Sequence, residues 1–157
     1  SIRQYGWNNN RISKEAGFNS RLDELQAAIL NLKLNYLKRN NLIRNKIAKN
    51  YIKNFKNLPI TFPKIFHNTF HNYHLFVIQT KKRNKLLNYL KSKKIISSIH
   101  YKFPLHKMPT FKGFKNSDMK RANRMSNTML SLPLYPELTA REQNKVIKMI
   151  KFFFKYN

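Results

Sequence analysis

The chain has 157 residues, with 32 lysines and arginines against six acidic residues, so its formal net charge is +26. Hydrophobic residues make up 41% of the chain and aromatic residues 13%, which excludes a disordered chain. The lack of cysteine excludes disulfides and thiolate metal sites. No apolar run reaches the roughly 20 residues that span a bilayer, and the polar first residues do not form a secretory signal, so we expect a cytoplasmic location.

Residues 17–37 predict a sharp turn followed by a long helix. Gly17 suits the turn, and Ser20 is a good N-cap that Asp23 completes as a weak capping box. Asn19 stands just before this cap, where its side chain either closes the turn or contacts an anion or a partner subunit. Apolar residues then recur at steps of three and four, which predicts one buried stripe: Leu22, Leu25, Ile29, Leu32 and Tyr36.

A second apolar phase follows Arg39 and indicates either a bend or a fresh helix. Its members are Ile43, Ile47, Tyr51 and Phe55. Basic side chains along this region predict a solvated face: Lys33, Lys38, Arg39, Arg44, Lys46 and Lys49. Pro59 and Pro63 end the helical region, because proline disfavours helix at the residue before it.

The next segments predict a small α/β layer. Residues 73–80 and 95–101 are short and rich in β-branched and aromatic residues, which is typical of strands. Between them, residues 84–91 predict a short amphipathic helix with Leu86, Leu87 and Leu90 facing inward. A strand, a helix and a strand in this order are the unit of an α/β fold.

The last part of the chain alternates loops and helices. Pro104, Pro109 and Gly113 mark a long loop, after which Ser117 or Asp118 is expected to cap a short helix. That helix carries Met119, Ala122 and Met125. Two prolines keep residues 130–136 extended, and a capping box from Thr139 to Glu142 opens a final helix. This helix is expected to bury Val146, Ile147, Ile150 and Phe153.

The stretch Gly-Phe-Asn-Ser-Arg-Leu-Asp-Glu-Leu-Gln-Ala-Ala, residues 17–28, resembles the signature of the DegT/StrS family of sugar aminotransferases. Further family-like segments follow the same order: Arg3–Trp7, Tyr73–Val77, Ile99–Tyr101, Pro104–His106 and Leu130–Pro136. The resemblance covers nearly the whole chain but only the C-terminal part of the usual family length. It implies an α/β fold with an α+β small domain, in which a long N-terminal interface helix precedes a small sheet packed with helices.

The resemblance also implies a pyridoxal 5'-phosphate (PLP) cofactor and an aminated nucleotide-linked keto-deoxysugar, made for amino-sugar or surface-polysaccharide biosynthesis. We expect residues 1–56 to be the motif loop and a helix bridging to the family's large domain, and residues 57–157 to be the small domain. That large domain, absent from this sequence, holds the Schiff-base lysine in the family, so the isolated chain is expected to be inactive. The resemblance implies a homodimer, or a dimer with a full-length homologue.

Four residues are site candidates by this resemblance. Asn19 would reach the phosphate of the PLP on the neighbouring subunit, and an amide donor can bind a dianion without adding charge. Arg21 is a candidate for the cofactor phosphate or the nucleotide diphosphate, or else a surface arginine at the helix start. His100 and Tyr101 would face the nucleotide-sugar from the end of a strand, unless they serve only in packing.

The other histidines point to no metal site. His74 is expected in the core, and His67, His71, His74 and His106 have few carboxylates and no cysteine beside them. Lys94 stands where the family usually has glycine, and a positive φ there costs a non-glycine residue on the order of 1 kcal/mol.

The basic charge alone favours a different class, a small nucleic-acid-binding α/β protein. Lysines are scattered through every segment, however, with asparagine almost as abundant, which is typical of coding bias. We therefore expect no specific nucleic-acid partner. A non-catalytic domain that dimerises with a full-length homologue is the third alternative.

Overall fold

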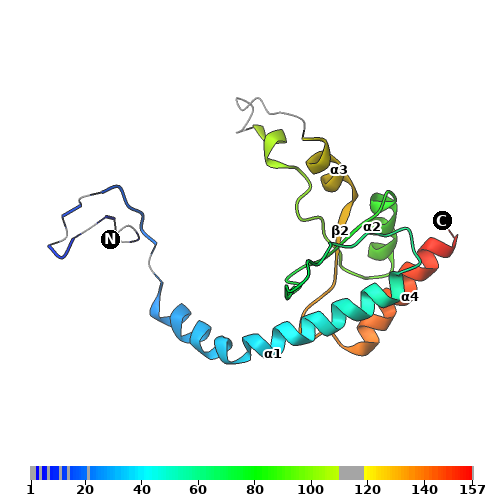
Figure 1. Cartoon of the computed structure of the whole chain (residues 1–157), viewed down its shortest axis with the longest axis horizontal. Coiled ribbons are helices and arrows are strands. Elements are labelled where there is room, and N and C mark those ends of the chain that lie inside the picture. Colours follow the sequence, from blue (N-terminus) through cyan, green and yellow to red (C-terminus); the bar gives the residue numbers. More distant parts are fainter. Residues whose placement is uncertain are drawn as a thin grey trace. The chain divides into compact units, whose positions relative to one another are not determined.

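The computed structural model describes the chain except for residues 1, 2, 4, 7, 11, 14, 21, 110–118 and 157. Its elements, labelled in Figure 1 where there is room, are helix α1 (Glu24–Phe55), strand β1 (Phe76–Gln79), helix α2 (Arg83–Ser92), the 3-10 turn η1 (Leu105–Lys107), helix α3 (Lys120–Thr128), strand β2 (Met129–Leu132) and helix α4 (Ala140–Tyr156). Two compact units, Ser1–Arg39 and Asn40–Asn157, divide within α1. The expected division between residues 56 and 57 stays a prediction.

The helix α1 begins at Glu24 and not at Ser20. The backbone carbonyl of Asp23 accepts the first helical bond, from Ala27 N at 2.9 Å. The Ser20 amide instead donates to the Arg3 carbonyl at 3.0 Å, which holds Ser20 in the loop. The helix then runs without interruption to Phe55, so no fresh helix begins at the second apolar phase.

The second half of α1 packs into the core of the second unit. Tyr51 and Phe55 are fully buried, and the Tyr51 ring stacks on Phe55 at 5.6 Å and on Phe76 at 5.1 Å between centroids. The Tyr51 hydroxyl donates to the Pro133 carbonyl at 3.0 Å, and burial raises the pKa of this phenol. Arg44, predicted on the solvated face, is half-buried and donates to the carbonyls of His74 and Leu134 at 3.4 and 3.2 Å.

The sheet is small and antiparallel. The two strands β1 and β2 pair in the register Phe76 with Leu132 and Ile78 with Leu130. Single antiparallel bridges extend this pair on both sides, from Thr61 to Gln79 and from Ser98 to Ser131. The β-branched and aromatic residues of 95–101 predict a strand, but this prediction is wrong, because only Ser98 among them pairs with β2. The second strand comes from residues 129–132, within the region that the prolines kept extended.

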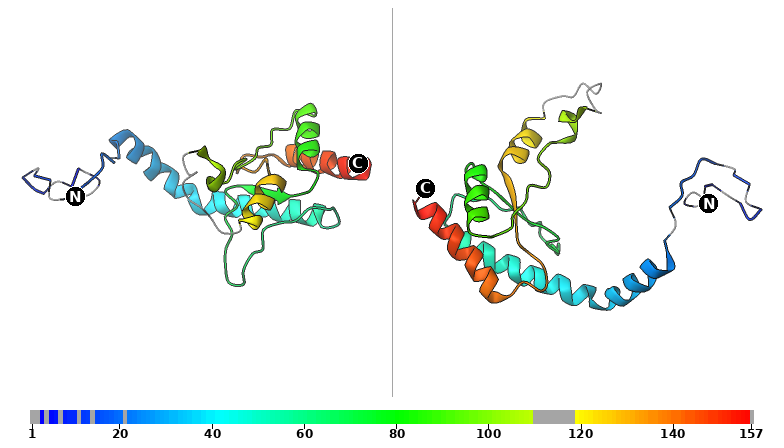
Figure 2. Two further views of the ribbon diagram at one scale, coloured as in Figure 1. Left: turned by 90° about the horizontal axis from the view of Figure 1, so that it is seen from above. Right: turned by 180° about the vertical axis from the view of Figure 1, so that it is seen from behind.

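Helices α2 and α4 complete the core with α1, as Figures 1 and 2 show. Leu86 and Leu90 of α2 are fully buried, and the four residues predicted for α4 (Val146, Ile147, Ile150 and Phe153) are buried. The predicted capping box is present, since Thr139 N donates to Glu142 Oε2 at 2.9 Å and Glu142 N donates to Thr139 Oγ1 at 3.2 Å. The hydrogen bonds from Thr139 lower the pKa of Glu142.

Lys94 adopts the positive φ of 56° expected at this position. It follows α2 in a Schellman motif, with Lys94 N bonded to the Lys91 carbonyl and Ile95 N to the Leu90 carbonyl. Ile95 and Leu90 are both buried, which supplies the apolar contact of that motif. The caps proposed for α3, Ser117 and Asp118, lie outside the described residues, and Met119 is the N-cap residue.

Two further expectations are wrong. The stripe on the first half of α1 is exposed, from 48% at Ile29 to 74% at Leu25, because the described residues provide no surface that covers it. His74 is exposed and precedes β1, so it is not a core residue.

Candidate functional site

The loop before α1 is held by hydrogen bonds among its own residues, most of them to backbone carbonyls. Tyr5 N donates to the Phe18 carbonyl at 3.1 Å, and Ser13 Oγ donates to the carbonyls of Tyr5 and Glu15 at 2.9 Å. Gly6, and not the predicted Gly17, takes a positive φ, of 71°. A Cβ at Gly6 would collide with the Glu15 carbonyl, so this close approach requires glycine.

Asn19 lies at the end of this loop with its side chain exposed. Its neighbours on both sides are fixed, because Phe18 accepts from Tyr5 and Ser20 donates to Arg3. Asn19 lines a hollow together with Leu22, Asp23 and Glu24. The amide is thus presented to solvent by a bonded backbone. Arg21, the other predicted cofactor residue, lies outside the described residues.

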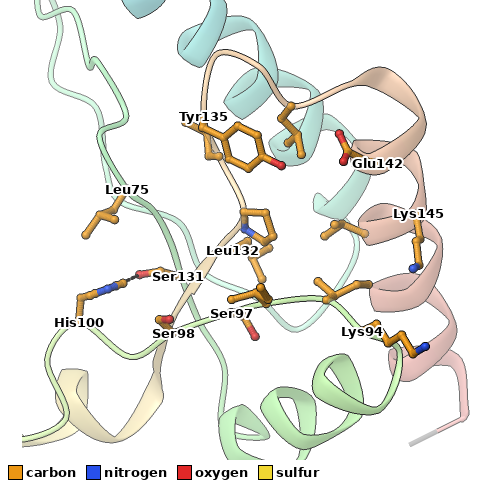
Figure 3. A pocket seen from close by; sticks show the side chains of 16 residues that line it. Leu75, Lys94, Ser97, Ser98, His100, Ser131, Leu132, Tyr135, Glu142 and Lys145 are labelled. Carbon is orange, nitrogen blue, oxygen red and sulfur yellow. Dashed lines mark hydrogen bonds between the residues drawn. The ribbon is translucent and has the colours of Figure 1, made fainter.

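His100 lies on the border of two pockets in the second unit. One pocket, of about 550 Å³, is shown in Figure 3 and receives polar groups from residues 94–100, from β2 and from the start of α4. The other, of about 520 Å³, is mainly apolar and is lined by Tyr101, η1 and α3, with Met108, Met125 and Met129 in its wall. His100 therefore borders one pocket with both polar and apolar walls and a second pocket that is mainly apolar.

A buried serine holds the His100 ring. Ser131 Oγ lies 2.9 Å from His100 Nδ1, the contact drawn as a dashed line in Figure 3. Tyr101 is 76% exposed, with its ring edge-on to His100 at 6.0 Å between centroids. The two predicted substrate residues are thus adjacent at one pocket border, whereas Asn19 belongs to the first unit.

Sequence reasoning missed Ser131, because residues 130–136 were interpreted only as an extended segment. The sequence shows a serine between Leu130 and Leu132 but not its burial, which results from the strand pairing. A buried hydroxyl requires a hydrogen-bond partner, and Ser131 has one in His100.

The described residues contain neither a cluster of metal ligands nor a helix that could cross a membrane. Within them, no three histidine, aspartate or glutamate side chains gather as a metal site would require. Among the described helices, none combines the length and apolar character needed to cross a membrane.

Solved structures with the same fold include aminotransferases. The chain superposes with a TM-score of 0.92 on the structure of DesV from S. venezuelae in complex with a ketimine intermediate, at 31% identity over 98% of this chain and 42% of that one. It also superposes on NtdA from Bacillus subtilis with the bound cofactor PMP, with a TM-score of 0.86, at 26% identity over 98% of this chain and 38% of that one.

The chain belongs to the DegT/DnrJ/EryC1/StrS aminotransferase family, whose model matches residues 1–151. A similar protein is the dTDP-3-amino-3,6-dideoxy-alpha-D-galactopyranose transaminase of Aneurinibacillus thermoaerophilus, 34% identical over 95% of this chain and 41% of that protein. The chain thus spans about two fifths of the length of the curated relatives it matches, which agrees with the C-terminal part that its motifs indicated.

Proposed function

We propose that this chain is the C-terminal portion of a PLP-dependent aminotransferase that aminates a nucleotide-linked keto-deoxysugar. The observation that carries the proposal is the fold match to DesV, which extends over 98% of the chain with a TM-score of 0.92. The name of the Aneurinibacillus relative, a transaminase of a dTDP-linked deoxysugar, supports the substrate class. The amino donor would be an amino acid, and the product would enter amino-sugar or surface-polysaccharide biosynthesis.

In this proposal the chain contributes only part of an active site. The Schiff-base lysine would come from a large domain encoded outside this sequence, to which residues 1–56 form the bridge. PLP, when bound, supplies the electron sink for amino-group transfer. The contribution of this chain is to bind and orient, through Asn19 in the first unit and through His100 and Tyr101 in the second.

Asn19 fits the phosphate of PLP as an additional donor. Its amide is neutral, exposed and positioned by bonded neighbours, so it can donate to a dianion without reorganising the loop. Asp23 and Glu24 line the same hollow, and their carboxylates repel a phosphate. We therefore assign further phosphate donors to another polypeptide, as in a composite site at a dimer interface. Arg21 belongs to this proposal from its sequence position.

His100 and Tyr101 fit a ligand rich in hydroxyl and phosphate oxygens. The Tyr101 side chain is exposed beside the apolar pocket, where its hydroxyl can donate to a ligand or accept from it. His100 offers a ring nitrogen at the border of the pocket shown in Figure 3. We assign both to the nucleotide-sugar.

Absorbance spectroscopy and reductive trapping test the proposal. The isolated chain mixed with PLP is expected to show no visible band and no lysine labelled after borohydride reduction. A complex of the chain with a polypeptide that carries the family's lysine domain is expected to show both, and to aminate a nucleotide-linked keto-deoxysugar. Stoichiometric trapping at one lysine of the isolated chain would contradict the proposed division of the site.

A further inference from the structure

Ser131 lines a pocket but is buried, and its backbone is held in the sheet on both edges. It is 5% exposed, and its backbone is bonded on one edge to Ser98, with N–O distances of 2.8 and 3.1 Å. On the other edge it is the register partner of Val77 in β1. Its Oγ therefore has a defined position in the sheet, 2.9 Å from Nδ1 of His100.

The hydrogen bonds available to Ser131 Oγ indicate whether the serine hydroxyl or His100 Nδ1 is the donor. Among the described residues, the one hydrogen bond of Ser131 Oγ is to His100 Nδ1. If Nδ1 carried the proton, the buried serine hydroxyl would keep a donor with no acceptor, and a buried donor left unsatisfied costs about 1–3 kcal/mol. If the serine donates, its hydrogen is satisfied and Nδ1 accepts with its lone pair.

We propose that Ser131 is a positioning residue that donates to Nδ1 of His100 and thereby holds the neutral imidazole as its Nε2–H tautomer. The inference rests on the proposed function for the role of His100, but the tautomer itself is a property of the chain. His100 Nε2 has no hydrogen bond within the described chain and remains available to a ligand.

The consequence is that His100 presents a hydrogen-bond donor, Nε2–H, at the pocket border. A neutral Nε2–H donates one hydrogen bond and adds no charge, so it recognises an acceptor oxygen: a carbonyl, a hydroxyl or a phosphate oxygen. His100 is then a neutral donor to a sugar or diphosphate oxygen, and not a group that switches between donating and accepting. Ser131 determines the tautomer of His100 through its hydrogen bond to Nδ1 on the buried side of the ring.

Nitrogen NMR tests the assignment on the full chain without any ligand. Long-range proton–nitrogen correlations distinguish pyridine-like from pyrrole-like ring nitrogens, and the His100→Gln variant identifies the His100 signals. At a pH where the imidazole is neutral, we expect Nδ1 to be pyridine-like and Nε2 pyrrole-like. In Ser131→Ala, we expect both to shift toward the averaged values of a tautomer mixture.

Two variants separate positioning from packing. Ser131→Thr keeps the hydroxyl and should retain the Nε2–H tautomer, whereas Ser98→Ala removes an exposed hydroxyl of the same pocket and should leave His100 unchanged. A wild-type His100 with its proton on Nδ1, or a tautomer unaffected by Ser131→Ala, would overturn the inference. Titration with dTDP-glucose, followed at Nε2, tests the proposed function separately, since a failure to bind leaves the ligand-free tautomer as measured.

Discussion

The two halves of α1 belong to one uninterrupted helix yet differ in what surrounds them. From Ile47 to Phe55 its apolar side chains are buried except for the half-buried Ile52, and Ala48, Tyr51 and Phe55 are completely inaccessible. From Leu25 to Leu37 its apolar side chains are about half to three-quarters exposed. A helical period therefore shows which side chains share a face, but it does not show whether the chain itself covers that face.

The exposed half is apolar on two faces. Leu25, Ile29, Leu32 and Tyr36 form one stripe, and Leu30, Leu34 and Leu37 form a second at the spacing i, i+4 and i+7. A helix with apolar residues on more than one side is usually buried. This agrees with the proposal that residues 1–56 bridge to a large domain outside this sequence.

Alanine substitutions in the two halves of α1 should change the free energy of unfolding by very different amounts. Phe55→Ala removes a completely buried ring and should lower the free energy of unfolding by about 3–5 kcal/mol. Leu32→Ala, the matched change on the exposed half, should alter it by no more than about 0.5 kcal/mol. Urea denaturation of both variants measures the difference. Equal losses would show that the first half of the helix is covered within the chain.

Lys94→Gly should stabilise the second unit. The lysine has a φ of 56°, which costs an L-residue roughly 1–2 kcal/mol, and part of the gain is offset by the greater freedom of glycine in the unfolded chain. We expect a net gain of about 1 kcal/mol, or about 2–4 °C in Tm for a chain of this size. Lys93→Gly is the control, because Lys93 has a φ of −91° and should lose stability. A destabilised Lys94→Gly would contradict the strain assigned to this turn.

Thr139→Ala tests the start of α4. The change removes the side-chain half of the capping box and should cost about 1 kcal/mol. Glu142 has a folded-state pKa below its usual 4.5, so its contribution is present at neutral pH and is lost as the pH falls through the folded pKa. The stability difference between wild type and Thr139→Ala should thus shrink in acid. A difference that is constant from neutral to acid pH would contradict this link.

Ser97→Ala should have the smallest effect. Ser97 Oγ is buried and has no hydrogen-bond partner among the described residues, so its removal loses no bond. We expect unchanged or slightly increased stability by thermal denaturation. A clear loss would mean that this hydroxyl has a partner.

Local signals were sufficient for the elements that depend on local chemistry. The capping box at Thr139 and the buried face of α4 follow from short spacings in the sequence, whereas the turn at Lys94 was expected from the glycine that the family usually has there. Elements that depend on distant partners were not predictable in this way. The segment 95–101 has the β-branched and aromatic residues of a strand, yet only Ser98 finds a partner, and the helix starts late because Ser20 is bonded to Arg3.

The candidate site shows the same limit. The pair His100 and Tyr101 could be singled out from the motif, but Ser131 acts across a strand pairing that no local pattern reveals. Asn19 could be placed before a helix, although its neighbours Phe18 and Ser20 are bonded to Tyr5 and Arg3 and not to the helix cap.

In the proposed function, the Asn19 amide donates to a PLP phosphate held by another polypeptide. The most direct measurement is the PLP dissociation constant of the complex between this chain and the polypeptide that carries the lysine domain. Hydrogen bonds to charged groups contribute about 1.5–3 kcal/mol, so Asn19→Ala should weaken PLP binding roughly tenfold or more, while Asn9→Ala, in the same loop, should not. An unchanged PLP affinity in Asn19→Ala would contradict the account.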